Sequence, residues 1–367
     1  MKISALVLMC PCRKTVAMPI RHVVLALAVA VLWGLNFLAI HLSLEQFPPL
    51  FLVALRFALL AIPTLLLVPR PDVPLRWLLG YGLGFGTLQF FGLYLGMAAG
   101  FPAGLASLVL QSSAPFTVLL GALLLRERLS GRRMAGVAVA VVGLGVVGLT
   151  RGGLDGWIPF LLVVLGGFGW ALGNLASRQA RAPQPMHLVL WMTVVPPLPM
   201  LALSVAVEGP VQIGDALVGA FTAEALPAWL GLLYTVIAGT VIGSAVWVWL
   251  MARHPASTVA PFSMLVPVVG ILAAWAWLGE VPLHGEILGG VLVVGGVLWA
   301  NGRSRPRRDG ASAGTAPVPA PPRQRGEPSP SAPGHATAPV SHTRTTARLI
   351  PVRPLAGIRS GYGTEHQ

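Results

Sequence analysis

A single arginine, Arg56, lies inside the long apolar stretch "FLVALRFALLAIP" at residues 51–63. If a membrane-spanning helix starts at Pro49, a rise of 1.5 Å per residue places Arg56 about 10 Å from the helix start. A charge near the bilayer centre costs roughly 2.5–3.5 kcal/mol on insertion scales, so its presence needs a reason. Two interpretations stay open. Either the side chain reaches the outer headgroups or pairs with Glu45, or its guanidinium faces a water-filled cavity and binds a carboxylate.

Polar side chains inside other apolar segments are further candidates for a binding site. In segment 104–125, Ser107 and Gln111 lie four residues apart, on one face of a helix. The amide of Gln111 both donates and accepts hydrogen bonds, so we expect it to line a cavity. Ser112 either joins it or bonds back to its own helix. The remaining candidates for substrate binding are Asn36, Asn174, Ser263, Gln89, Tyr94, Trp170 and Trp247.

Structural roles stay open for some of these candidates. Asn36 and Asn174 lie in related parts of two segments, where an amide either bridges two helices or binds the polar groups of an amino acid. Trp170 and Trp247 are aromatic, and such residues also pack helices together or form the belts at membrane interfaces.

The composition indicates an integral membrane protein. Of the 367 residues, 55% are hydrophobic and only 10% are charged, and the mean hydropathy is +0.76. A soluble domain of this size needs more polar surface. The formal net charge is +13, but the basic residues lie in short loops and a tail, without a basic stripe. We therefore expect no nucleic-acid partner. The expected partners are the lipid bilayer and a small-molecule substrate.

Ten apolar segments are long enough to cross a bilayer as helices. They are separated by short connections rich in Pro and Gly, and only the connection at 207–226 is longer. The sequence therefore predicts an all-α membrane protein with ten spans. The spans are 22–42, 50–68, 77–98, 104–125, 133–150, 157–176, 186–206, 227–250, 257–278 and 285–301.

The distribution of arginine predicts the orientation. With a cytoplasmic N-terminus, the outside connections contain only Arg151, whereas the inside connections contain all other loop arginines. This asymmetry follows the positive-inside rule and predicts a multi-pass protein of the plasma membrane with both termini in the cytoplasm. The inside arginines are Arg70, Arg76, Arg126, Arg128, Arg132, Arg133, Arg178, Arg181 and Arg253.

Both ends of the chain differ from the part that spans the membrane. Residues 1–19 form an N-terminal extension, in which Cys10 and Cys12 can neither staple the fold nor complete a metal site. Met18 opens a stretch that is typical of a natural start. Residues 303–367 are rich in Pro, Ala, Ser and Arg and predict a disordered basic cytoplasmic tail. The tail either is simply solvated or holds anionic lipid through Arg303–Arg308.

Two halves of the chain, residues 20–151 and 152–302, share a pattern. "LWGLNFLAI" in the first span corresponds to "GWALGNLAS" in the sixth, and Pro115 and Glu127 correspond to Pro267 and Glu280. Five spans per half is an odd number, so the two halves have opposite orientations in the membrane. Such inverted repeats are typical of transporters that expose a central site to each side in turn.

The same stretches resemble a known family, the EamA branch of the drug/metabolite transporter superfamily, and most closely its cysteine and O-acetylserine exporters. The resemblance covers about residues 20–301 and is carried by "WGLNFLAIHLSL", "PPLFLVALRF", "RPDVPLRWLLGYGL", "PAGLASLVLQSSAPFTVLLGALLLRERLSG" and "APFSMLVPVVGILAAW". It implies the fold described above and export of small amino-acid-type metabolites. It also places an arginine at Arg56. The ending "GEVPLHG" at 279–285 departs from the family pattern.

The absence of several nucleotide-binding and catalytic motifs excludes some classes of function. Lys2 and Lys14 are the only lysines, so the chain has no Walker A motif, and it has neither a nucleophile elbow nor a zinc-binding helix. We expect no cofactor and no enzyme activity. An exporter of drugs or nucleosides is the first alternative, and a membrane enzyme or a channel is the second. Glycines at 136, 285 and 289 pack the two halves together or form a homodimer.

Overall fold

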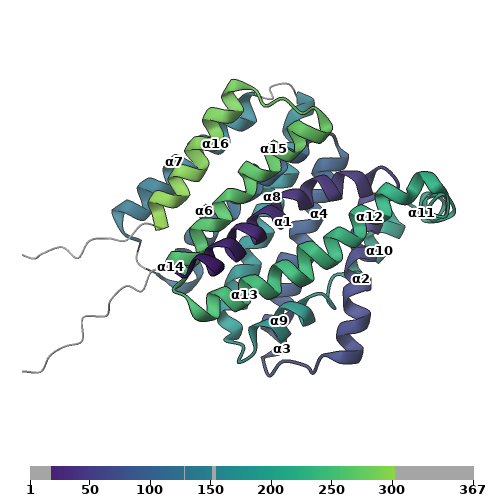
Figure 1. Cartoon of the computed structure of the whole chain (residues 1–367), viewed down its shortest axis with the longest axis horizontal. Helices are drawn as coiled ribbons and strands as arrows, with labels where there is room; N and C mark the ends of the chain where they lie inside the picture. Colours follow the sequence, from purple (N-terminus) through teal and green to yellow (C-terminus); the bar gives the residue numbers. More distant parts are fainter. Residues whose placement is uncertain (1–17, 128, 151–153, 302–367) are drawn as a thin grey trace, which may run out of the picture. The chain divides into compact units, whose positions relative to one another are not determined.

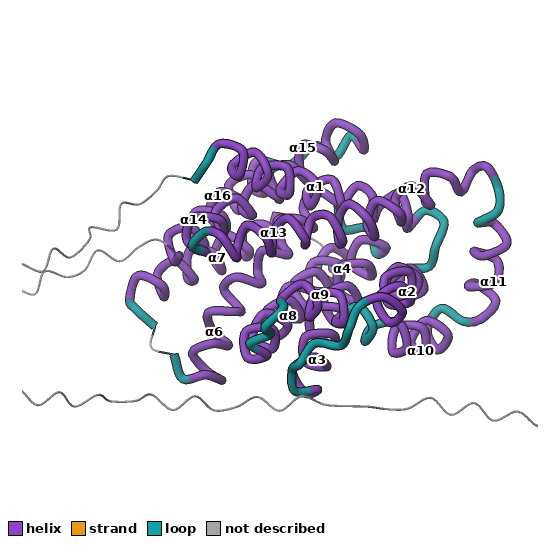
Figure 2. The backbone as a smooth tube through the Cα atoms, turned by 60° about the horizontal axis from the view of Figure 1, so that its bottom comes forward, coloured by secondary structure: helices purple, strands orange, loops and turns teal. Residues whose placement is uncertain are grey.

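A computed structural model describes residues 18–127, 129–150 and 154–301, all of which belong to one structural unit. The regular structure of these residues is helical throughout, without a strand (Figure 2). The expectations for residues 1–17, including Cys10 and Cys12, and for the tail from Arg303 onward concern residues outside the described ranges.

Nine helical segments in the described ranges are long and apolar enough to cross a membrane, and His284–Ala300 is apolar but shorter. Each coincides with one of the predicted spans. The sixth continues to Ala180 and the eighth begins at Ala223, about a turn beyond the predicted limits, because a helix continues past the edge of its apolar stretch. The nine are Ile20–Leu44, Pro49–Leu67, Leu75–Ala98, Ala103–Leu125, Gly131–Thr150, Gly156–Ala180, Pro185–Val207, Ala223–Arg253 and Ser257–Leu278.

Prolines begin many of these helices, since the fixed φ of proline suits a first helical turn and its missing N–H is not needed there. The elements of the first half are α1 (Ile20–Leu44), α2 (Pro49–Leu67), α3 (Leu75–Tyr81), the π-helix η1 (Gly82–Leu88), α4 (Gln89–Ala98), α5 (Ala103–Val109), the 3₁₀-helix η2 (Leu110–Ser112), α6 (Ser113–Leu125) and α7 (Gly131–Thr150).

The second half has a similar order with two differences: its seventh span is divided into α9 and α10, and the long connection after this span forms α11 and η3. Its elements are α8 (Leu154–Ala180), α9 (Pro185–Met192), α10 (Pro197–Val207), α11 (Pro210–Gly219), the 3₁₀-helix η3 (Ala223–Ala225), α12 (Leu226–Tyr234), the π-helix η4 (Thr235–Ile242), α13 (Gly243–Arg253), α14 (Ala256–Val259), the 3₁₀-helix η5 (Ala260–Leu265), α15 (Val266–Leu278) and α16 (His284–Asn301).

The third, fourth, eighth and ninth spans change helix type, and these changes match between the halves, whereas the break between α9 and α10 in the seventh span has no counterpart in α2. The third and eighth spans change to a π-helix at η1 and η4, and the fourth and ninth change to a 3₁₀-helix at η2 and η5. The apolar stretches predict continuous helices at these places, because hydropathy does not distinguish the three helix types. Changes of helix type in mid-span often mark functional or hinge positions.

The two halves are interleaved. In Figure 1, the purple α1 of the first half runs among the green helices of the second half and contacts α12, α13 and α15. Conversely, α8 of the second half packs against α3, η1, α4 and α6 of the first. The pairs α2 and α10, and α7 and α16, also join the halves. The most extensive helix–helix contacts therefore join the two halves.

Glycines allow α7 and α16 to lie in close contact. A Cβ atom at Gly136 would lie 2.6 Å from the Gly296 carbonyl oxygen, and one at Gly143 would lie 2.7 Å from that of Gly289. The backbones thus touch at a distance that side chains would prevent. The predicted small-residue surface is used inside the chain, to join its first and second halves.

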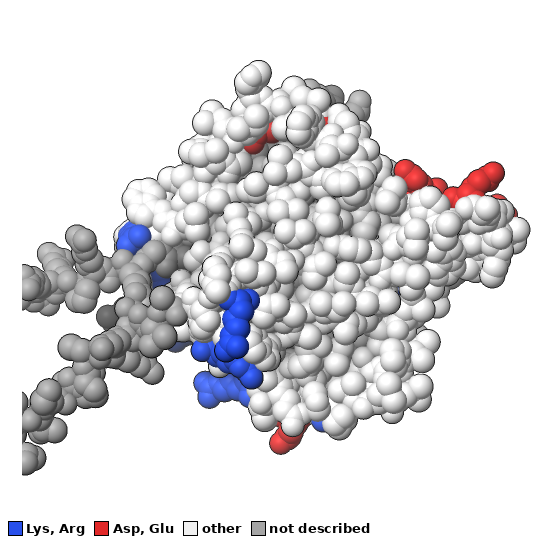
Figure 3. Space-filling model, viewed as in Figure 1, with Lys and Arg blue, Asp and Glu red and all other residues white. Residues whose placement is uncertain are grey.

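Charged side chains are unevenly distributed over the surface. Figure 3 shows basic side chains gathered near the end of α13 and acidic side chains near α11. Arg253 lies in the last turn of α13, and Asp215 lies in α11. This separation agrees with the charge asymmetry of the connections in the sequence.

Candidate functional site

Arg56 lies in the middle of α2 and is only 4% exposed. Its Nη1 donates a hydrogen bond to the hydroxyl of Tyr94 at 3.1 Å, and its Nη2 donates one to the hydroxyl of Thr240 at 2.9 Å. The guanidinium carbon also lies 4.2 Å from the ring centre of Phe90, in a cation–π contact. Three elements, α2, α4 and η4, therefore meet at this side chain.

The π-helix η4 determines how the Thr240 hydroxyl is used. Its Oγ1 donates to the carbonyl of Thr235, five residues earlier, at 2.9 Å, which is the spacing of a π-helical turn. The hydroxyl proton is occupied there, so the oxygen presents its lone pairs to Arg56. The Tyr94 hydroxyl also accepts from Arg56, which leaves its own proton available for a third group.

Arg56 has no carboxylate partner among the described residues. Glu45 lies instead 3.9 Å from His41, so the predicted alternative of an Arg56–Glu45 pair is wrong. The burial of Arg56 also contradicts the alternative in which the side chain reaches the headgroups. Its Nε is buried without a hydrogen-bond partner. A buried guanidinium with an unused N–H and no counter-charge is suited to binding an anion.

Asn36 and Trp33 of α1 lie against Gly239, the neighbour of Thr240. Trp33 donates from Nε1 to the Gly239 carbonyl at 2.9 Å. The Oδ1 of Asn36 is buried without a hydrogen-bond partner, and a Cβ at position 239 would lie 2.6 Å from it. Only glycine fits there without displacing Asn36. The predicted residue Asn36 therefore lies next to the group that holds Arg56.

Several predicted residues lie at the interruptions of the spans or beside them. Gln89, at the start of α4, is buried, and its Oε1 has no hydrogen-bond partner. Gln111 in η2 donates from Nε2 to the sulfur of Met264 in η5 at 3.6 Å. The Oγ of Ser112 has no partner either, so the alternative that it bonds back to its own helix is wrong. Ser263 does make such a bond, to the Ala260 carbonyl at 2.7 Å.

The other predicted residues make contacts between helices. Asn174 in α8 donates to the hydroxyl of Thr117 in α6 at 3.2 Å, as the bridging interpretation predicts. Trp247 lies 5.2 Å from Trp33, measured between ring centres. Trp170 lies edge-to-face with Phe85 at 5.8 Å, and Phe85 in turn touches Phe90.

The predicted residues thus fall into two groups. Tyr94 contacts Arg56 directly, and Asn36, Trp247 and Trp170 are connected to it through two or more intervening residues. Gln111, Ser112, Ser263 and Asn174 lie instead on the fourth, ninth and sixth spans, and none of them contacts Arg56. Substrate contact stays a prediction for both groups.

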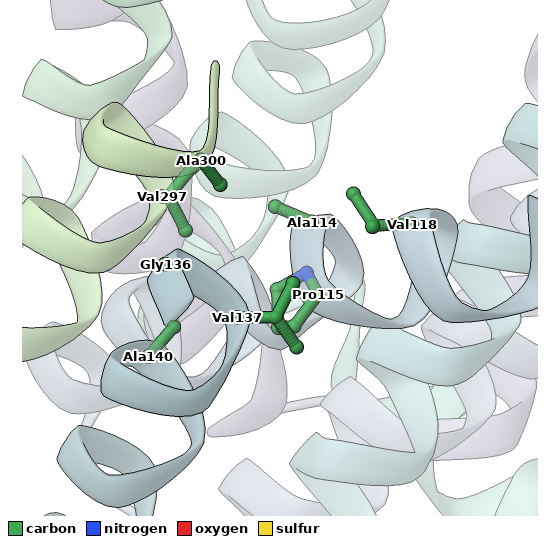
Figure 4. A pocket seen from close by; sticks show the side chains of 8 residues that line it. All are labelled: Ala114, Pro115, Val118, Gly136, Val137, Ala140, Val297 and Ala300. Carbon is green, nitrogen blue, oxygen red and sulfur yellow. The ribbon is translucent and has the colours of Figure 1, made fainter. Parts of the chain in front are cut away.

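A small hollow lies between α6, α7 and α16 (Figure 4). Its volume is about 10 Å³, roughly what one water molecule needs, and its lining is apolar. None of the residues that contact Arg56 line it, so it is not a candidate for the substrate. The lining residues are Ala114, Pro115, Val118, Gly136, Val137, Ala140, Val297 and Ala300.

Two residues of the site were not predicted from the sequence. Thr240 provides an acceptor for Arg56, and Phe90 provides the ring on which the guanidinium lies. Phe90 is one of many aromatic residues in apolar segments, and nothing in its sequence environment distinguishes it. Thr240 follows a glycine inside an otherwise apolar segment, which is a weak signal for a polar contact.

Comparison with known proteins identifies the family. Residues 20–149 and residues 157–302 each match the model of the EamA-like transporter family. The chain belongs to this family. The resemblance seen in the sequence motifs is thereby confirmed, and the chain is a membrane transporter by family.

Two relatives align with this chain over nearly their whole length. A protein of Salmonella typhimurium, named "Probable amino-acid metabolite efflux pump", is 41% identical over 279 residues, which are 74% of this chain and 92% of the relative. A protein of Escherichia coli with the same name is 40% identical over 280 residues, covering 75% of this chain and 92% of its own.

A more distant relative and a solved structure extend the comparison. A "Probable terminal-alkyne amino-acid exporter" of Streptantibioticus cattleyicolor is 29% identical over 216 residues, covering 58% of this chain and 68% of the relative. A crystal structure matches with a TM-score of 0.52 at 22% identity, over 77% of this chain and 98% of that one. At this identity the match shows a shared fold.

Proposed function

We propose that this EamA-family transporter exports small amino-acid-type metabolites and holds their carboxylate at Arg56. The names of three relatives support the cargo class, since each refers to amino acids or their metabolites. The observation that carries the proposal is the buried guanidinium of Arg56, whose Nε has no hydrogen-bond partner and which forms no ion pair with a carboxylate of the described residues. An anionic group of the substrate would neutralise it.

The groups around Arg56 suit a zwitterion. The unused N–H groups of Arg56 and the hydroxyl proton of Tyr94 are donors for a carboxylate. The side-chain oxygens of Asn36 and Gln89 are buried acceptors without partners, as an ammonium group requires. In this proposal Gln111, Ser112, Ser263 and Asn174 line the path between the fourth, sixth and ninth spans, while Trp170 and Trp247 form its apolar walls.

The proposed architecture has ten spans in two inverted repeats of five, at residues 20–151 and 152–302. Two separate family matches in one chain support it, and so do the paired π-helical and 3₁₀ interruptions. The arginine distribution supports a plasma-membrane orientation with both termini in the cytoplasm. Because the halves are interleaved around Arg56, rocking of the halves would expose the site to each side in turn.

Transport into inside-out vesicles tests the proposal. We expect saturable uptake of radiolabelled cysteine and O-acetylserine, and a loss of about 10-fold or more in Arg56→Ala, because charge-assisted hydrogen bonds contribute roughly 1.5–3 kcal/mol. Gln111→Ala should reduce uptake as well. Arg76→Ala, which removes an exposed arginine, is the matched control and should transport normally.

The same assay separates the alternatives. Uptake that survives in Arg56→Ala at normal protein levels would make Arg56 a structural residue and contradict the proposed site. Absence of uptake for both compounds, with uptake of a drug or nucleoside that has no carboxylate, would support a different cargo in the same fold. Single-channel conductance in a planar bilayer would indicate a channel.

A further inference from the structure

Two glutamates end equivalent spans in the same local backbone conformation. Glu127 follows α6 and Glu280 follows α15, and each comes directly after a residue in the left-handed region, Arg126 at φ 54° and Gly279 at φ 67°. The N–H of each glutamate donates to the carbonyl six residues earlier, at 3.3 Å in both cases. Both helices thus end at a residue in the left-handed conformation, which is a common helix ending. The two glutamates are therefore structural equivalents.

Their carboxylates have different partners. Glu280 accepts hydrogen bonds from the backbone N–H groups of Ala103 and Gly104, at 2.9 and 3.0 Å. It thereby caps the first turn of the fourth span, where unpaired N–H groups favour an anion. Glu127 makes no such cap. Its carboxylate pairs with Arg178 at 2.5 Å, with side chains 39% and 50% exposed.

The sequence contains an equivalent target for Glu127. Pro102, Ala103 and Gly104 begin the fourth span, and Pro255, Ala256 and Ser257 begin the ninth. Pro102 and Pro255 are separated by the same number of residues as Glu127 and Glu280. A cap by Glu127 on the ninth span would therefore repeat the observed cap by Glu280 on the fourth.

The contact between the fourth and ninth spans also differs between the Glu280 end and the Glu127 end. At the Glu280 end, α5 lies along α15, and a Cβ at Gly270 would lie 2.6 Å from the hydroxyl of Ser107. At the other end, α6 makes no comparable contact with α14 or η5. The spans touch midway, where Gln111 contacts Met264, and these two residues have the same separation along the chain as the glutamates. Both spans are 3₁₀-helical at this point.

We infer that Glu127 and Glu280 are alternating gate residues for the transport step. Glu280 holds the fourth and ninth spans together at one end while they are apart at the Glu127 end. In the opposite state, Glu127 leaves Arg178 and caps the ninth span at Ala256 and Ser257, while Glu280 releases Ala103 and Gly104. Gln111 and Met264 are the contact about which the two spans change their angle.

The cost of the exchange is small, because similar interactions are present in both states. A half-exposed ion pair such as Glu127–Arg178 contributes little to stability, so Glu127 can leave it. The cap that Glu280 loses is replaced by the cap that Glu127 gains. Two states of similar free energy are what alternating access requires. The inference rests on the proposed transport cycle but not on the identity of the cargo.

Reactivity of one cysteine tests the inference without a transport assay. The parent carries Ser107→Cys together with Cys10→Ser and Cys12→Ser, so that the only thiol lies buried between the fourth and ninth spans at the Glu280 end. In purified protein, we expect this thiol to react slowly with a maleimide. Glu280→Gln should raise the rate about 5-fold or more, because the cap weakens and that end opens.

Three further variants make the result decisive. Arg178→Ala releases Glu127 and should also raise the rate, whereas Glu127→Gln should not. Glu208→Gln is the matched control: Glu208 likewise accepts two backbone N–H groups, from Leu50 and Phe51, but at α2 rather than between the fourth and ninth spans. It should leave the rate unchanged in protein that elutes normally on gel filtration.

The outcomes separate this inference from the proposed function. A higher rate in both Glu280→Gln and Arg178→Ala supports the exchange. A rate in Arg178→Ala equal to that of the parent, or a similar rise in Glu208→Gln, overturns it and makes Glu280 an ordinary helix cap. Arg56→Ala should not change the pattern, so a failed substrate assay does not affect the result.

Discussion

Arg56 and Thr240, which lie 184 positions apart in the sequence, are joined by a hydrogen bond of 2.9 Å in the interior of the protein. The bond links α2 of the first half to the π-helix η4 of the second. The acceptor is a neutral hydroxyl, which fixes the position of the guanidinium. The positive charge of Arg56 is therefore not compensated by this partner. A carboxylate in the place of Thr240 would neutralise the charge, and the proposed binding of a substrate anion would lose its physical reason.

Thr240→Val should reduce the apparent affinity for the carboxylate substrate. Valine has nearly the shape of threonine but cannot accept the bond from Nη2, and a lost hydrogen bond to a buried charged group costs about 1.5–3 kcal/mol. We expect a fall of roughly 10- to 100-fold in vesicle uptake at low substrate concentration. Thr240→Ser should keep most of the activity. The buried Thr64, which bonds to its own helix at Leu60, provides the control Thr64→Val; an equal loss there would show a general packing effect.

Tyr94→Phe tests the second partner of Arg56. The substitution removes the hydroxyl but keeps the ring, which packs edge-to-face with Phe90 at 5.8 Å. We expect uptake to fall about 10-fold, since one hydrogen bond to a charged group is lost, with little change in thermal stability. Tyr81→Phe, at another buried tyrosine of the same span, is the control. Normal uptake by Tyr94→Phe would contradict a role of the hydroxyl in binding.

Glu208→Gln should lower stability but not transport. Glu208 accepts from the backbone N–H groups of Leu50 and Phe51 at 2.6 and 3.0 Å and from the hydroxyl of Ser204 at 2.6 Å. Loss of the charge at this helix start should cost about 1–2 kcal/mol. The midpoint of thermal unfolding in detergent measures the effect. Uptake per folded molecule should equal that of the wild type, and an unchanged midpoint would contradict the role of the cap.

Substitutions at two glycines of α7 distinguish the effect of close helix packing from the effect of helix propensity. Gly143 faces α16, where an added Cβ would lie 2.7 Å from the Gly289 carbonyl, whereas a Cβ at Gly145 would meet nothing within 4 Å. Gly143→Val should therefore lower the yield of folded protein and its thermal midpoint, because the two backbones must separate. Gly145→Val should have little effect. Similar behaviour of the two variants, measured by fluorescence-detected gel filtration, would show that the α7–α16 contact is not tight.

Hydropathy alone predicted the spans well. A lipid environment requires that every backbone group bond within its own helix, so long apolar stretches such as 50–68 have essentially one available structure. The interruptions of the helices were not predictable in this way. A π-turn at Thr235 or a 3₁₀ turn at Gln111 changes the bonding pattern by one residue without changing the composition of the segment.

The candidate site was predicted in part. Arg56 was conspicuous because a charge in an apolar span is costly, and Tyr94 and Asn36 were named as polar residues of neighbouring spans. Thr240 and Phe90 were missed, since the contacts that matter link different helices and sequence spacing carries no information about them. Ser112 lacks the bond to its own helix that was one of its alternatives, and Asn174 bridges two helices.

The sequence by itself determined that this protein spans a membrane, that it belongs to the EamA-like transporters, and that one arginine lies inside an apolar span. These features depend on hydropathy and local composition, which each segment carries alone. Only the tertiary structure decided which groups meet Arg56 and which of two equivalent glutamates caps a helix. Glu127 and Glu280 have matching sequence surroundings, so the sequence is compatible with either cap. The packing of the fourth span against the ninth selects the cap formed by Glu280.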